Sequence, residues 1–170
     1  MNRIALLRGV NLGRNRRISM GDLRDALTEA GYGDVRTHGQ SGNVLFSSRK
    51  KAPTLERELR DLIGVPVVVR TTQELAAVVE GDPLGGVWGN GSRYLVTFHS
   101  RPLAAVERRA LEELAAAPER MAVVGREVYS WHPRGFQGSR LGAALAAPRD
   151  VVATSRNWNT VLKLLALAQA

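Results

Sequence analysis

The sequence contains no cysteine, which excludes disulfide bonds, thiolate metal sites and cysteine nucleophiles. Apolar runs are only a few residues long, so no segment is expected to cross a bilayer. Near the amino terminus, only residues 4–7 form an apolar run before Arg8, which is too short for a signal peptide. We therefore expect a cytoplasmic protein with no membrane partner.

Several common binding motifs are also missing. Neither a G-x-x-x-x-G-K-[ST] nor a G-x-G-x-x-G loop occurs, so the standard nucleotide loops are absent. His38, His99 and His132 are far apart and lack the spacing of metal ligands. Aromatic residues make up 5% of the chain, and the expected central strands offer only Phe46 for stacking on RNA bases. We predict no metal and no cofactor.

The chain is rich in basic residues. The formal net charge is +8, from 24 basic and 16 acidic residues, and such a balance favours anionic partners. Arginine accounts for 21 of the basic residues, and these are scattered, a pattern also typical of a GC-rich genome. Nucleic acid is therefore a possible partner but not the favoured one.

The order of expected elements is the same in both parts of the chain. The first part gives a strand at 4–7, a helix after the capping box Ser19-x-x-Asp22, strands at 35–40 and 44–47, a helix near Pro53 and a strand at 65–70. A short helix capped by Thr71-x-x-Glu74 follows. This order is βαββαβ plus one helix.

A glycine-rich stretch at 81–92, with five glycines and one proline, separates this part from the next. Beyond it we expect a strand at 94–99, a helix from Pro102 with Leu103, Val106 and Leu111 inward, a hairpin of strands at 121–124 and 127–131, and a helix at 139–146. A brief strand at Val151-Val152 and a final helix containing a buried Trp158 complete the order. Residues 68–72 align with residues 151–155, which indicates an internal repeat.

These patterns predict an α+β protein made of two ferredoxin-like βαββαβ halves in tandem. Each half is expected to pack its helices on one face of an antiparallel sheet. The expected organisation is a first half at 1–81, a linker at 82–92, and a second half with a carboxyl-terminal helix at 93–170.

Three separated segments also carry a family resemblance. Residues 5–13 (ALLRGVNLG), 35–37 (VRT) with 40–44 (QSGNV), and 154–161 (TSRNWNTV) resemble the signature segments of the domain-of-unknown-function 1697 family. His38 and Gly39 depart from the family pattern, which usually has an aromatic and an aliphatic residue there. The resemblance covers nearly the whole chain. It implies a cytoplasmic bacterial protein with an α+β fold of ferredoxin-like character, and it brings no established activity.

The loop after the first strand is the first candidate binding site. It holds Arg8, Asn11 and Arg16 between a strand end and a helix start, where guanidinium forks and backbone N–H groups suit an anion. Arg156 and Asn157 are expected to open the final helix and to face an anion in the same way, with Thr154 or Ser155 as its cap. The structural alternative is turn chemistry at the loop and a helix cap with an apolar anchor at the final helix.

A second candidate segment contains Gln40, Ser41 and Asn43. It is not a G-x-S-x-G nucleophile elbow, because Asn43 takes the place of the last glycine and strands flank the segment. A hairpin held by side-chain hydrogen bonds is the favoured interpretation, although the amide groups could also recognise a ligand.

No catalytic constellation accompanies these segments. The leading hypothesis is a binding module for an anionic small molecule, either a nucleotide or a phosphorylated metabolite. The alternatives are a non-specific nucleic-acid-binding protein, a small enzyme that uses Ser41, His38 or His132, and a structural protein whose polar motifs join the two halves. The sequence carries no signal for a particular oligomeric state.

Overall fold

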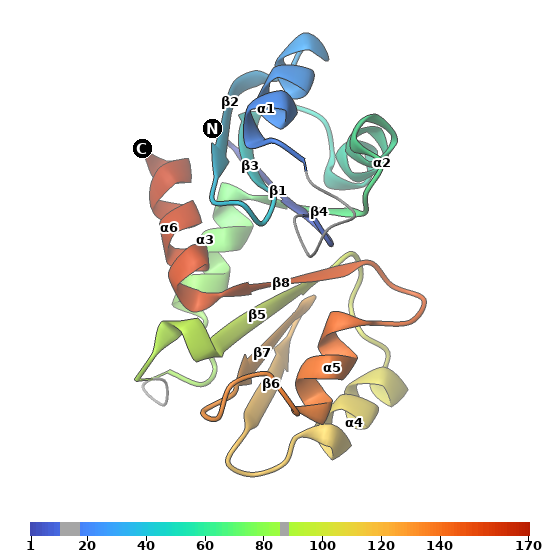
Figure 1. The fold of residues 1–170 in the computed structure, drawn as a ribbon, viewed down its shortest axis with the longest axis vertical. Coiled ribbons are helices and arrows are strands. Elements are labelled where there is room, and N and C mark those ends of the chain that lie inside the picture. Colours follow the sequence, from blue (N-terminus) through green and yellow to red (C-terminus); the bar gives the residue numbers. More distant parts are fainter. Residues whose placement is uncertain (11–17, 86–88) are drawn as a thin grey trace. The chain divides into compact units, whose positions relative to one another are not determined.

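A computed structural model describes residues 1–10, 18–85 and 89–170 (Figure 1). The chain divides into two units, one made of Met1–Ala77 with Lys163–Ala170 and the other of Val78–Leu162. The expected linker at 82–92 falls within the second unit, and its residues 86–88 lie outside the described ranges. The sequence predicted a second half at 93–170, which includes Lys163–Ala170. In the structure these last residues belong to the first unit.

The first unit contains one four-stranded antiparallel sheet with the strand order β2-β3-β1-β4. This is the order of a ferredoxin-like βαββαβ fold. Its elements are β1 (Arg3–Leu7), α1 (Met20–Glu29), β2 (Gly33–His38), β3 (Asn43–Ser47), α2 (Ala52–Ile63) and β4 (Val67–Thr71), and α3 (Thr72–Glu80) follows.

Local signals set the ends of these helices. Ser19 caps α1 by accepting a hydrogen bond from the backbone N–H of Asp22 at 3.4 Å. Before α3, the hydroxyl of Thr71 accepts from the Glu74 N–H at 3.0 Å, and the Glu74 carboxylate accepts from the Thr71 N–H at 2.8 Å. In both expected capping boxes the cap hydroxyl therefore accepts a hydrogen bond from the backbone N–H three residues on. In the second box the carboxylate also accepts a hydrogen bond from the backbone N–H of the cap residue.

The core of the first unit is apolar and well filled. One face of the sheet supplies Leu7, Phe46 and Val69, among other residues, and α1 and α2 cover that face. Each helix contributes two fully buried leucines, which are Leu23, Leu27, Leu55 and Leu59. This burial provides the main hydrophobic stabilisation of the unit.

The second unit repeats this architecture. Its antiparallel sheet has the order β6-β7-β5-β8, and the expected fold of two ferredoxin-like halves is confirmed. The elements are the 3-10 turn η1 (Gly91–Arg93), β5 (Tyr94–His99), α4 (Ala105–Leu114), β6 (Arg120–Val124), β7 (Glu127–Trp131), α5 (Arg140–Ala146), β8 (Ala153–Asn157) and α6 (Trp158–Gln169).

The two sheets also share their pairing register. Ile4 of β1 pairs with Arg70 of β4, and Val96 of β5 pairs with Arg156 of β8. The structural match of the repeat thus places Arg70 with Arg156, whereas the sequence alignment paired Arg70 with Ala153. The sequence alignment was wrong by three residues, because two short valine runs matched each other by chance.

Three other local expectations for this half were wrong. The last strand is β8 rather than Val151-Val152, because the pairing with β5 begins at Ala153. The helix expected from Pro102 begins at Ala105, after Ala104 as its cap residue. Val106, expected to face inward, is 74% exposed. Among the described residues, no helix combines the length and apolar character needed to span a membrane.

Candidate functional site

Arg8 lies at the end of β1, beside the turn that joins β2 and β3. Its backbone N–H donates to the carbonyl of Pro66 at 2.9 Å, and the N–H of Leu7 donates to the carbonyl of Gly42 at 2.9 Å. Gly42 has a φ of +74°, and an added Cβ would come within 2.7 Å of the Leu7 Cβ. The strand end and the turn are therefore packed closely together, and this contact requires glycine.

The turn itself is held by a buried amide. The Nδ2 of Asn43 donates to the carbonyl of His38 at 2.9 Å and to the hydroxyl of Ser41 at 3.2 Å. These hydrogen bonds support the hairpin interpretation of this segment. Gln40 and Ser41 are exposed, and Arg8 is half-buried. Asn11 and Arg16 lie outside the described residues, so a ligand site at this corner stays a prediction.

Arg156 and Asn157 belong to the other unit and occupy a different element from the one expected. They are the last residues of β8 and do not lie in α6. The Arg156 guanidinium is buried, its Nη1 donates to the Thr154 hydroxyl at 2.7 Å and to the Ser155 carbonyl at 2.8 Å, and burial lowers its pKa to about 10. A ligand-binding role for these two residues stays a prediction.

Asn157 caps the following helix. Its Oδ1 accepts a hydrogen bond from the N–H of Thr160 at 2.9 Å. The cap expected at Thr154 or Ser155 therefore lies further along the chain, because those residues continue the strand. Asn157 occupies the position in the second half that Thr71 occupies in the first.

His132 takes part in a buried polar network. Its Nδ1 lies 3.0 Å from the Glu119 carboxylate, and its Nε2 lies 2.9 Å from the hydroxyl of Ser130. The order carboxylate, imidazole, hydroxyl is that of a catalytic triad. However, His132 and Ser130 are both completely buried, so no substrate reaches the hydroxyl in this conformation. The network joins β7 to the segment before β6.

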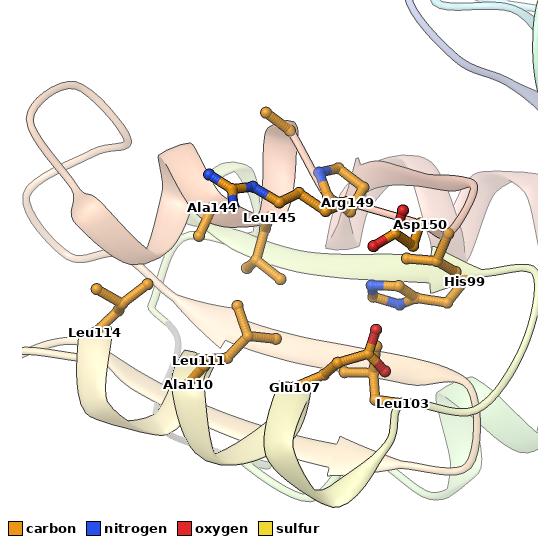
Figure 2. Close-up of a pocket in the computed structure, with 13 residues that line it drawn as sticks. His99, Leu103, Glu107, Ala110, Leu111, Leu114, Ala144, Leu145, Arg149 and Asp150 are labelled. Carbon is orange, nitrogen blue, oxygen red and sulfur yellow. The ribbon is translucent and has the colours of Figure 1, made fainter.

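A cavity of about 520 Å³ lies in the second unit between α4, α5 and the loop before β8. In Figure 2, Leu111 of α4 and Leu145 of α5 point toward each other across it. Its walls are mainly apolar, and its polar lining residues gather at one end and along the mouth. The lining residues are His99, Leu103, Glu107, Ala110, Leu111, Leu114, Ala144, Leu145, Ala147, Pro148, Arg149, Asp150 and Val151.

The helix-covered face differs between the two halves around this cavity. By register, Ser130 replaces Phe46, His99 replaces Leu7 and Ser155 replaces Val69 on the helix-covered face of the sheet. The equivalent of the twelve-residue α2 is α5, which has seven residues. In addition, α4 contributes no fully buried side chain, whereas α1 contributes two. Of these three replacements, His99 lines the cavity, and the short helix α5 and the helix α4 border the open space.

Glu107 and His99 lie at the polar end, where Figure 2 shows the carboxylate facing the imidazole. Arg101 binds the Glu107 carboxylate in a bidentate manner with two hydrogen bonds of 2.8 Å, and the Ala104 N–H adds a third at 2.6 Å. The hydrogen bonds from Arg101, followed by the one from Ala104, lower the pKa of Glu107 to about 2. This pair fixes the start of α4 against the end of β5.

Arg149 and Asp150 line the mouth. Figure 2 shows Arg149 extending over Ala144 and Leu145, while Asp150 lies on the side of His99. Asp150 has a φ of +57°, a backbone conformation that aspartate and asparagine tolerate better than most residues. Although they are neighbours in sequence, the two side chains form no ion pair with each other.

Sequence reasoning did not find this cavity. A signal was present in the alternation of the strand at 94–99, where Leu95, Thr97 and His99 share one face. That face is the one covered by helices, so two of its three residues are polar where a core strand normally supplies apolar groups. Assigning the face correctly requires knowledge of the strand pairing.

The fold and the cavity define an α+β protein of two tandem ferredoxin-like halves with an open pocket in the second. The chain belongs to the family described as "Protein of unknown function (DUF1697)", whose model matches residues 1–129. This match confirms the family resemblance, and its range includes the signature segments that end at residue 44 but not the segment at 154–161.

A solved structure extends the comparison to nearly the whole chain. The conserved bacterial protein SP0830 from Streptococcus pneumoniae is similar over 99% of this chain and 98% of its own, with a TM-score of 0.80 and 22% sequence identity. At this identity the likeness shows the fold alone. No curated protein matches the sequence significantly.

Proposed function

We propose that the protein is a small-molecule-binding module whose ligand occupies the cavity between α4 and α5. The observation that carries this proposal is the open volume of about 520 Å³ at a place where the first half has a filled core. Ligand pockets are commonly 300–1,000 Å³, mainly apolar, with a few polar groups that orient the ligand. The cavity has each of these properties.

Binding fits the lining residues better than catalysis does. Both carboxylate oxygens of Glu107 accept hydrogen bonds from Arg101, and the pKa of about 2 makes this group a weak base. The Nδ1 of His99 lies 3.2 Å from the carbonyl of Arg126, which fixes the ring against its own sheet. Since a carbonyl accepts and does not donate, Nδ1 carries a proton and acts as the donor.

We also propose that the ligand carries an anionic group, which would lie at the mouth of the cavity. Arg149 is exposed there, and the formal net charge of +8 favours negatively charged partners. The ligand would then carry an anionic group at the mouth and an apolar group inside. The nucleic-acid alternative rests on the net charge alone.

A fluorescent apolar anion, anilinonaphthalene sulfonate, provides a direct test. We expect saturable binding to the folded protein with a stoichiometry of one, measured by fluorescence titration. Ala144→Phe fills the cavity from α5 and should weaken the affinity by about tenfold or more, which corresponds to about 1.4 kcal/mol.

The matched control is Ala143→Phe, on the same helix but outside the cavity lining. It adds the same ring on the exposed face, and the dye affinity should stay near that of the wild type. If Ala144→Phe binds the dye as tightly as Ala143→Phe does, the cavity is not the binding site and the proposal fails.

A further inference from the structure

The charges at the cavity mouth point to a particular class of ligand. We propose that the cavity binds a zwitterion of the apolar amino-acid type, with its carboxylate at Arg149, its ammonium group at Asp150 and its apolar side chain between α4 and α5. This inference rests on the proposed function and specifies the ligand of the same cavity.

The first supporting observation concerns Arg149. Its side chain is exposed at the mouth, and within the described parts of the chain it makes no hydrogen bond and no ion pair. A guanidinium presents a fork of N–H donors that matches the two oxygens of a carboxylate. Arg149 therefore offers an available carboxylate-binding group directly above the apolar wall formed by Ala144 and Leu145 (Figure 2).

The second observation concerns Asp150. The backbone carbonyl of Asp150 accepts a hydrogen bond from Arg101 at 3.4 Å, but the strong hydrogen bonds of Arg101 go to Glu107. Among the residues that the structure describes, none donates a hydrogen bond to the Asp150 carboxylate. The Arg101 guanidinium interacts electrostatically with the carboxylates of both Glu107 and Asp150. One cation and two carboxylates leave a net negative charge at this end of the mouth, and Asp150 presents the carboxylate that accepts no hydrogen bond from Arg101.

These two charges are separated along the mouth and have opposite signs. A simple carboxylate would satisfy Arg149 but would bring its charge near Asp150, and a simple amine would do the reverse. A ligand that carries both groups on one carbon complements both residues at once. Complementarity of this kind mainly determines which ligand is preferred.

The interior of the cavity specifies the rest of the ligand. Leu103, Leu111 and Leu145 supply branched apolar surface, and the volume of about 520 Å³ exceeds what a small side chain would fill. Burial of an aromatic or long aliphatic group there removes apolar area from water and supplies the main part of the affinity. We therefore expect large apolar side chains to bind better than small ones.

Three matched probes test the proposal. Phenylalanine carries both charged groups, phenylpropanoate lacks the ammonium group, and phenylethylamine lacks the carboxylate. Calorimetric or NMR titration of the wild-type protein should show that phenylalanine binds about tenfold tighter than either analogue, a difference typical of one added charge-assisted contact.

Two variants assign the charged groups. Arg149→Gln should remove the preference for phenylalanine over phenylethylamine, because the carboxylate loses its partner. Asp150→Asn keeps a residue that tolerates positive φ and should remove the preference over phenylpropanoate. The matched controls Arg109→Gln and Glu113→Gln change the same charges at exposed positions of α4 that do not line this cavity, and they should keep both preferences.

The outcomes separate this inference from the function on which it rests. Equal affinity for all three probes, lost in Ala144→Phe, would retain the cavity as a binding site but overturn the zwitterion. Binding of anilinonaphthalene sulfonate without binding of phenylalanine would overturn it as well. If neither the dye nor any probe binds, the proposed function itself fails.

Discussion

The carboxylate of Glu107 accepts three hydrogen bonds, two from the Arg101 guanidinium and one from the Ala104 backbone. These contacts favour the ionised form, so the folded-state pKa of about 2 lies below the ordinary value of 4.5. A group with a depressed folded pKa stabilises the protein at pH values above its unfolded pKa. That stabilisation is lost as the pH falls through the folded pKa.

This pKa shift predicts a specific acid sensitivity. Between pH 4.5 and about 2, wild-type stability should fall more steeply than that of Glu107→Gln, measured by urea unfolding at several pH values. Arg101→Gln removes the strongest donors and should move the carboxyl titration of Glu107 toward 4.5, measured by carbon NMR.

The control for this prediction is Arg108→Gln, which breaks an exposed ion pair with Glu112 on the same helix. It should leave the titration of Glu107 unchanged. A wild-type Glu107 that titrates near its ordinary value would contradict the hydrogen-bonded geometry described above.

At the level of elements, both halves pass from their last strand directly into a helix, and the final strand residue is the cap. Thr71 caps α3 and Asn157 caps α6, each by accepting from the N–H three residues on. Such a direct junction leaves no loop to absorb a change in direction, so the cap side chain contributes to holding the strand end and helix start together.

Substitution of Asn157 tests its role as the cap of α6. Asn157→Ala should lower the free energy of unfolding by about 1 kcal/mol, because the Thr160 N–H loses its acceptor. Asn157→Asp keeps an acceptor oxygen and should remain close to the wild type in urea unfolding. A loss of equal size in both variants would show that the side chain acts through some contact other than the cap.

Local sequence signals located most elements. The capping boxes before α1 and α3, the proline at the start of α2 and the β2–β3 turn depend on neighbours in sequence, and each was predicted correctly. By contrast, β8 reads Ala-Thr-Ser-Arg-Asn and has little intrinsic strand preference. Its pairing with β5 makes it a strand, and sequence reasoning therefore placed that strand too early.

The candidate site was harder to predict for the same reason. The sequence drew attention to arginines in conspicuous motifs, and one of these, Arg156, is buried within its own unit. The cavity depends on which strand positions face the helices, for example His99 at the end of β5, which lines it. That relation comes from long-range pairing, which a single sequence does not display.

At the scale of the whole molecule, the two halves share one backbone fold but differ in the side chains that lie between the sheet and its helices. In the second sheet, the Thr97 and Ser155 hydroxyls lie 2.8 Å apart, at positions that hold Ala5 and Val69 in the first. These hydroxyls satisfy each other. Loss of one partner costs more than loss of both, because the remaining hydroxyl is left without its hydrogen bond.

We therefore expect strong coupling between these two positions. Thr97→Val alone should destabilise the protein by about 1–3 kcal/mol, since the Ser155 hydroxyl loses its partner. The double variant Thr97→Val with Ser155→Ala should recover most of that loss in urea unfolding. Additive losses in the double variant would show that the pair is not a mutually satisfying unit.

The replacement of Leu7 by His99 at equivalent positions, beside the cavity, has a consequence for how each half responds to mutation. Side-chain volume in the first half is committed to keeping the chain folded, so truncations there reduce the amount of native protein. In the second half the cavity beside His99 is open, so side-chain bulk added at its lining should reduce the space for the proposed ligand. Variation between relatives should therefore alter abundance when it falls in one half and selectivity when it falls in the other.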